Sequence, residues 1–151
     1  MSRISLPIRR INPQRDADLP APKYQSAGAA GMDLHAALAG PVTLMPLQRH
    51  AVPTGLQIAV PPGYEGQLRP RSGAALKLGL GLANSPGTID SDYRGELLVA
   101  VVNLSEGPLI LERGQRIAQL VICPVVQADL LWQEDLDGTE RGSGGFGSTG
   151  A

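Results

Sequence analysis

Leu97-Leu98-Val99-Ala100-Val101-Val102 is apolar at every position, so the strand that it predicts is apolar on both faces. Two arrangements explain such a strand. It is buried on both sides within one chain, or one face packs on the core and the other on a second subunit. The chain offers only Trp 1, Tyr 3 and Phe 1 as large aromatic core residues, and this scarcity favours the second arrangement.

Turn residues divide the rest of the chain into short segments. Gly occurs 19 times and Pro 13 times in 151 residues, which leaves too few uninterrupted stretches for a helical bundle. Short strands at this spacing predict an all-β antiparallel sandwich or barrel in one domain. We expect strands over residues 4–11, 42–47, 51–60, 64–69, 96–103, 109–111, 115–126 and 130–134, and one short helix over residues 72–77.

Charge and cysteine content exclude several classes of protein. Lys+Arg 13 against Asp+Glu 14 gives a net charge of -1 without a basic block, so we expect neither a nucleic-acid partner nor a membrane partner. The single Cys123 cannot form an internal disulfide or a Cys-based zinc site, and its apolar neighbours predict a buried core residue. Residues 1–13 contain no continuous apolar stretch, so we do not expect a signal peptide there. A cytoplasmic setting fits this composition.

Three polar segments are candidates for chemistry. Asp90-Ser91-Asp92 could be a polar hairpin tip, or one of its carboxylates could activate water in a cleft. Pro70-Arg71-Ser72-Gly73 could be a plain turn, or it could start a helix with Ser72 as N-cap and bind an anion. Residues 137–151 could be a solvated tail, or their Arg, Phe, Ser and Thr could wrap a phosphate and stack on a base.

The order of five segments is more specific than any one of them. They are Ala27-Gly28-Ala29-Ala30-Gly31-Met32-Asp33-Leu34, Pro70-Arg71-Ser72-Gly73, Gly87-Thr88-Ile89-Asp90-Ser91-Asp92-Tyr93-Arg94-Gly95-Glu96, Gly114-Gln115-Arg116-Ile117-Ala118-Gln119 and Arg141-Gly142-Ser143-Gly144-Gly145-Phe146-Gly147-Ser148-Thr149-Gly150. This series resembles the five motifs of the trimeric deoxyuridine triphosphatases (dUTPases), from about Lys23 to Gly150.

The resemblance implies a jelly-roll homotrimer with shared active sites and a flexible Gly-rich arm. It places the jelly-roll core in residues 1–136 and a lid in residues 137–151. The implied reaction converts dUTP to dUMP and pyrophosphate, which limits uracil in DNA and supplies dUMP for dTMP synthesis. Mg²⁺ would be held mainly by the substrate phosphates and water, with no direct protein ligand.

The resemblance also implies a role for each site residue. Asp90 would deprotonate the attacking water, and Tyr93 would lie against the deoxyribose and exclude a 2′-OH. Uracil would meet the hairpin, and the phosphates would meet the second motif, the fourth motif and the arm. The implied substrate-binding residues are Arg71, Ser72, Gly73, Asn84, Thr88, Ile89, Asp90, Tyr93, Leu98, Gln119, Arg141, Phe146, Gly147, Ser148 and Thr149.

Two other functions stay open at this point. A dCTP deaminase of the same superfamily needs a glutamate general base, for which Glu96 is available, although Tyr93 and the arm argue against it. The second open function is a non-catalytic jelly-roll binding module. An intact Asp90 together with the arm argues against such a module.

Overall fold

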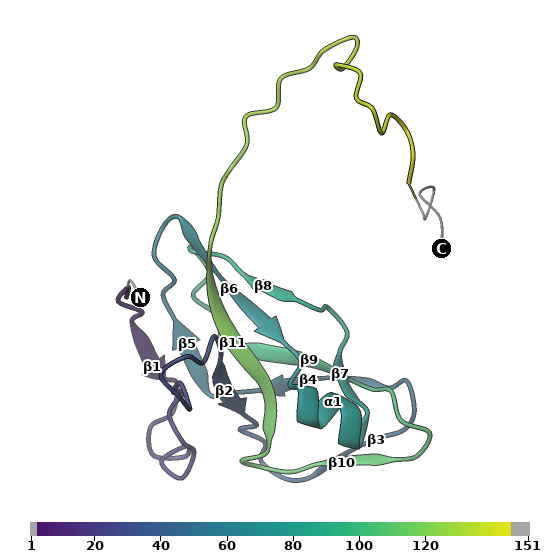
Figure 1. The fold of residues 1–151 in the computed structure, drawn as a ribbon. Coiled ribbons are helices and arrows are strands. Elements are labelled where there is room, and N and C mark those ends of the chain that lie inside the picture. The colour runs from purple at the N-terminus through teal and green to yellow at the C-terminus, as the bar shows by residue number, and fades with distance from the viewer. Residues whose placement is uncertain (1–2, 146–151) are drawn as a thin grey trace.

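The chain folds into short antiparallel strands with one short helix, in a computed structural model that describes residues 3–145. Its elements, coloured along the chain in Figure 1, are β1 Ile8–Arg10, β2 Met32–His35, β3 Val42–Leu44, β4 Arg49–Pro53, β5 Leu56–Ile58, β6 Tyr64–Arg69, α1 Ser72–Leu78, β7 Leu80–Leu82, β8 Gly87–Ile89, β9 Leu98–Asn103, β10 Leu109–Leu111 and β11 Arg116–Pro124.

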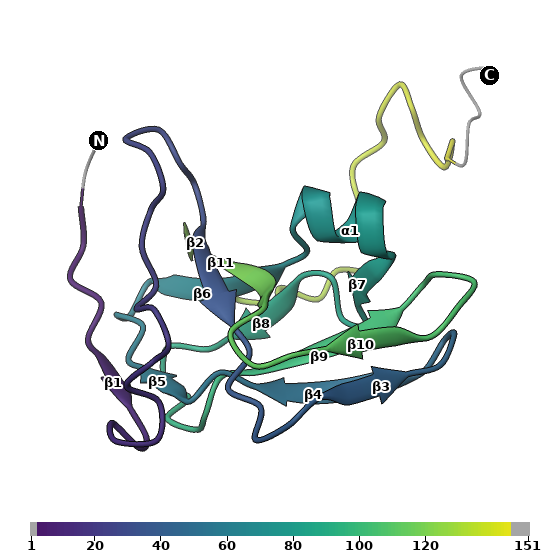
Figure 2. The same ribbon diagram turned by 90° about the horizontal axis from the view of Figure 1, so that it is seen from below.

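The larger sheets have the strand orders β2-β11-β6-β8 and β4-β9-β7, and the pairs β1-β5 and β10-β3 complete the set. All pairings are antiparallel. Figure 2 shows β6 and β11 lying over β4 and β9, so the sheets form two layers around a common core. The expected all-β jelly-roll sandwich is confirmed.

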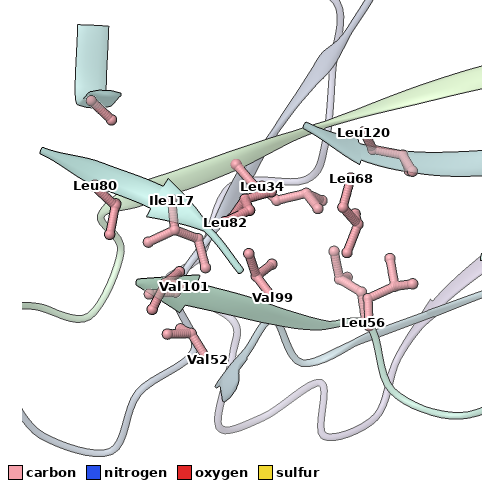
Figure 3. Packing of buried hydrophobic residues seen from close by; sticks show 14 of the residues in the cluster. Leu34, Val52, Leu56, Leu68, Leu80, Leu82, Val99, Val101, Ile117 and Leu120 are labelled. Atoms are coloured by element: carbon pink, nitrogen blue, oxygen red, sulfur yellow. The ribbon is translucent and has the colours of Figure 1, made fainter. Parts of the chain in front are cut away.

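The stretch Leu97–Val102 provides one wall of that core. Leu97, Val99 and Val101 are each 0% exposed, and Val99 and Val101 lie opposite Leu34 and Ile117 in Figure 3. Each such side chain contributes roughly 1.5–3 kcal/mol when it leaves water. The other face is not covered throughout, because Leu98 is 46% exposed. Burial on both sides within one chain is therefore not observed at this end of the strand.

Several expected strands differ from the observed ones. Residues 51–60 are interrupted between β4 and β5, where Gly55 has a φ of 70°. Residues 130–134 form no strand, and Trp132 is 90% exposed because no described strand pairs with it. The sequence interpretation missed β2, β7 and β8, which have only three or four residues each and are defined by their partners.

The helix begins where it was expected, but its N-cap differs. Arg71 is the N-cap residue, with φ −94° and ψ 130°, and no side chain caps the helix. The prediction that Ser72 is the N-cap is therefore wrong, because the extended backbone that precedes the first turn belongs to Arg71. Gly79 closes the helix in the left-handed conformation that Gly tolerates, with φ 66°.

The chain leaves the sandwich after β11, as Figure 1 shows. Cys123 near the end of that strand is partly exposed rather than buried, and its Sγ accepts a hydrogen bond of 3.7 Å from Arg69. Leu130, Leu131 and Leu136 are 81%, 81% and 85% exposed. Among the described residues, no helix is both long and apolar enough to cross a membrane.

Candidate active site

A pocket of about 200 Å³ opens beside the hairpin that follows β8. It is smaller than the roughly 300–1,000 Å³ of pockets that enclose drug-sized ligands. The structure brings together six of the predicted binding residues here. The lining residues are Leu68, Asn84, Gly87, Thr88, Ile89, Asp90, Tyr93, Glu96 and Leu98.

Buried and exposed residues alternate along β8, and the exposed ones give the pocket its polar side. Gly87 and Ile89 are buried, so Thr88 and Asp90 point the other way and are exposed. Gly66 on the neighbouring strand makes this packing possible, since a Cβ there would lie 3.2 Å from the Cβ of Ile89. The buried Ile89 thus anchors the strand end that Asp90 directly follows.

The Tyr93 ring is fixed by its own hairpin. The Tyr93 amide donates to the carbonyl of Asp90 at 3.2 Å, and the Tyr93 hydroxyl donates to the carbonyl of Glu96 at 2.9 Å. The ring lies over Gly95, where any Cβ would overlap with the phenol. The result is an aromatic wall held at both ends, which suits a site that selects by shape.

A second polar group lies where the helix begins. Arg71 donates from Nε to Asp33 at 2.7 Å, and Arg116 donates to the other oxygen of Asp33 at 3.4 Å. The side chains of Asp33 and Arg71 are only 11% and 23% exposed. With Nε engaged, the remaining guanidinium nitrogens of Arg71 are oriented and available to an anion.

Gln119 joins this group from β11. Its Nε2 donates to the carbonyl of Pro70 at 2.8 Å, one residue before Arg71. Its amide lies against Gly31, where a Cβ would come within 2.5 Å of Oε1. The absence of a side chain at Gly31 therefore makes room for Gln119, and Gln119 fixes the start of the helix.

His35 is next to this group at the end of β2. Burial lowers the pKa of His35, an effect that Arg116 and Arg71 reinforce and that the charge of Asp33 opposes. Its Nδ1 is buried without a hydrogen-bond partner. Because the lowered pKa favours the neutral imidazole, the charged partners of Asp33 are Arg71 and Arg116.

Among residues 3–145, the other predicted site residues are not part of the pocket lining. Arg71, Ser72, Gly73 and Gln119 lie outside it, although Gln119 pairs with Arg69 next to the lining residue Leu68. Arg141 is exposed and donates to the carbonyl of Gly144 at 2.7 Å. Phe146, Gly147, Ser148 and Thr149 lie outside the described residues.

The sequence interpretation did not include Leu68, Gly87 or Glu96 among the binding residues, yet all three line the pocket. The sequence analysis considered Glu96 only as the general base of a deaminase, whereas in the structure its carbonyl accepts from the Tyr93 hydroxyl. Within residues 3–145, no three His, Cys, Asp or Glu side chains gather into a group that could hold a metal ion.

Comparisons with known proteins agree with this architecture. The sequence model of the dUTPase family matches residues 17–150. A deoxyuridine 5'-triphosphate nucleotidohydrolase of Methylocella silvestris is 55% identical over 98% of this chain and 92% of its own. One of an Anaeromyxobacter strain is 55% identical over 97% of this chain and 98% of its own.

The fold agrees as well. A structure of the Staphylococcus bacteriophage 80alpha dUTPase with dUpNHpp matches with a TM-score of 0.86 and 28% identity, over 97% of this chain and 99% of that one. The antiparallel jelly roll, with a pocket on the hairpin after β8, therefore falls in the class of β proteins to which the solved dUTPase belongs. Within that class, the chain belongs to the dUTPase family.

Proposed function

We propose that this protein hydrolyses dUTP to dUMP and pyrophosphate, with Asp90 as the general base. The observation that carries the proposal is the pocket in which the Asp90 carboxylate lies beside the fixed ring of Tyr93. Relatives that are 55% identical bear the name of this activity, and a related phage enzyme is described with dUpNHpp.

The pocket would take the base and the sugar. The backbone of Thr88 and Ile89, together with the Asn84 amide, offers hydrogen-bonding groups to a uracil edge, and Leu98 supplies an apolar wall. The Tyr93 ring would lie against the deoxyribose. Against a ring fixed in this way an added hydroxyl would overpack the site, which typically costs about 1–3 kcal/mol.

Asp90 would perform the proton transfer. Its carboxylate accepts a proton from a water molecule, whose oxygen then forms a bond to the α-phosphorus. The bond from the α-phosphorus to the bridging oxygen of the β-phosphate breaks, and pyrophosphate leaves with that oxygen. A positioned base of this kind contributes about 10²–10⁴-fold to the rate.

The residues present fit a Mg²⁺ ion that arrives with the substrate. No group of three potential ligand side chains exists among residues 3–145, and Mg²⁺ commonly binds through phosphates and waters with few protein oxygens. The triphosphate and water would hold the ion, as the resemblance to the family implies, with no direct protein ligand. When bound, it would neutralise charge on the phosphate oxygens.

The phosphates would lie on the second polar group and under the arm. Arg71, which Asp33 orients, would be joined by Ser72, Gly73 and Gln119. The arm, residues 137–151, would add Arg141, Gly147, Ser148 and Thr149, and Phe146 would stack on uracil. Closure of such a lid would exclude water from the site.

A homotrimer with shared sites would bring these parts together. Within one chain the described phosphate-binding candidates Arg71, Ser72, Gly73 and Gln119 do not line the pocket, and the apolar Leu98 is exposed at its edge. A neighbouring subunit that covers this face would complete the site. The consequence for the cell would be less uracil in DNA and a supply of dUMP for dTMP synthesis, and the cytoplasmic setting stays a prediction.

The test is a nucleotide panel with Mg²⁺, scored for pyrophosphate and for ammonia. We expect pyrophosphate from dUTP, and little from dTTP, dCTP or UTP. Asp90→Asn should lower turnover about 10²–10⁴-fold while nucleotide binding persists. Asp92→Asn is the matched control, because Asp92 is exposed on the same hairpin and does not line the pocket. Near-normal turnover by Asp90→Asn refutes the assignment, and ammonia from dCTP would indicate a deaminase.

A further inference from the structure

Glu96 lines the pocket, and both its side chain and its main chain are engaged. Its carboxylate Oε1 accepts from the amide of Gly55 at 2.8 Å, and its carbonyl accepts from the Tyr93 hydroxyl at 2.9 Å. One residue therefore connects the selective ring of the pocket to the break between β4 and β5.

That break creates the need for an acceptor. Gly55 lies between the two strands with a φ of 70°. Around it the backbone still pairs with the segment before β9: the Thr54 amide donates to the carbonyl of Leu97 at 3.2 Å, and the Leu97 amide donates to the carbonyl of Leu56 at 2.8 Å. The buried amide of Gly55 is bonded to the Glu96 carboxylate instead. An unsatisfied buried amide is costly, so this contact is strongly favoured.

Gly55 is fixed from its other side as well. A Cβ at position 55 would lie 2.5 Å from Oδ2 of Asp16, which is 0% exposed. Arg15 and Arg113 bind that carboxylate at 2.6 and 3.1 Å. The two guanidinium groups lower the pKa of Asp16, so it stays ionised and bound to them near neutral pH. The Gly55 backbone therefore lies closely against this ion-pair group.

From these contacts we infer that Glu96 is a positioning residue that sets the discrimination between deoxyribose and ribose. It transmits the rigidity of the Asp16 group through Gly55 to the carbonyl that holds the Tyr93 hydroxyl. Loss of the carboxylate releases the Gly55 amide, lets residues 93–96 move, and opens space beside the sugar. We expect the change to affect the fit of the sugar more than the proton transfer at Asp90. This inference rests on the proposed dUTP hydrolysis.

The experiment compares kcat and KM for dUTP and for UTP in four proteins: wild type, Glu96→Ala, Glu96→Gln and Glu106→Ala. Glu106→Ala is the control, because Glu106 is exposed and does not line the pocket. In Glu96→Ala we expect the ratio of kcat/KM for dUTP over UTP to fall about 5- to 10-fold, the value of one lost hydrogen bond between neutral groups such as the Tyr93 hydroxyl and the Glu96 carbonyl. The change should come from KM, with kcat for dUTP within about twofold of wild type.

Glu96→Gln keeps an oxygen acceptor for the Gly55 amide, so it should restore most of the ratio. A purely structural role would lower thermal stability without changing the ratio. Tyr93→Phe provides a second variant, because it removes only the hydroxyl that the Glu96 carbonyl accepts from, and it should lower the ratio in the same direction.

An unchanged ratio in folded Glu96→Ala overturns the inference, as does a Glu96→Gln protein that behaves like Glu96→Ala. If Glu96→Ala does not fold, an unchanged ratio in Tyr93→Phe overturns it. Failure of the proposed function gives a different result, since the wild-type protein then releases no pyrophosphate from dUTP.

Discussion

Replacing Gly31 by alanine should impair the enzyme through Gln119, a residue 88 positions away in the sequence. Nothing in the backbone forbids alanine there, because Gly31 is not among the positions with positive φ. The new Cβ would lie 2.5 Å from Oε1 of Gln119 and 3.3 Å from its Cβ and Cδ. The amide must rotate away, and it then loses its 2.8 Å hydrogen bond to the Pro70 carbonyl.

The size of the effect follows from that one bond. A typical hydrogen bond contributes about 0.5–1.5 kcal/mol. We therefore expect Gly31→Ala to lower the free energy of unfolding by about 1 kcal/mol. Because Gln119 and Arg71 are proposed to meet the phosphates, kcat/KM for dUTP should fall about 5- to 10-fold, which is about 1–1.4 kcal/mol.

Gly28→Ala is a close control, because Gly28 lies in the same glycine-rich segment and a Cβ there would meet nothing within 4 Å. The decisive test is a double-mutant cycle of Gly31→Ala and Gln119→Ala. Pyrophosphate release and denaturant unfolding are measured for each protein of the cycle. Gly31→Ala should cost little in a protein that already carries Gln119→Ala, since the clashing amide is gone. Equal effects of Gly31→Ala in both backgrounds, or a Gly31→Ala protein equal to Gly28→Ala, would refute this reasoning.

Three further outcomes are expected. Mixing Asp90→Asn protein with protein truncated before Arg141 should restore part of the activity, because the proposed trimer would rebuild an intact site from the two variants. Sedimentation of an active monomer would contradict this. Phe146→Ala should lower dUTP turnover less than the truncation does, since the proposed stacking of Phe146 on uracil is worth only roughly 1–3 kcal/mol. The Phe146→Ala protein should still reject dTTP, dCTP and UTP in the same assay. Because burial lowers the pKa of His35 from 6.5, the unfolded chain binds the extra proton more readily, so stability should decline as the pH falls through and below about 6.5. Denaturant titrations from pH 7.5 to pH 5.5, in roughly unit steps, should show a flatter profile for His35→Gln.

Strands that turn residues bound clearly were predictable from the sequence, and strands without such bounds were not. The strands at Tyr64–Arg69 and Leu109–Leu111 match their expected bounds, because Gly63 and Pro70 flank the first and Pro108 precedes the second. Gly87–Ile89 itself begins with a glycine, and its pairing with Gly66–Leu68 is a long-range contact that local sequence does not encode. Residues 130–134 show the opposite error, since an apolar run without a partner strand stays extended and exposed.

Some residues of the candidate site were predictable from the sequence, and others were not. The resemblance to a family named Asp90, Tyr93 and Asn84, and the structure places all three around one pocket. The role of Glu96 could not be predicted, because it depends on an amide that becomes available only where Gly55 interrupts the strand. Side-chain spacing predicts which groups approach one another along a strand. It does not predict which backbone groups lose their partners.

The extended run after Pro124 makes the enzyme vulnerable to a protease in a way that no measure of global stability reports. Leu130, Leu131 and Trp132 are exposed to solvent. An endoprotease with a preference for large apolar residues can therefore cut there without prior unfolding of the sandwich. One cut would detach every residue of the fifth motif and leave all the strands intact. The clipped product would elute, melt and scatter light much like a folded protein. Loss of turnover in an ageing preparation should therefore be checked first by intact mass.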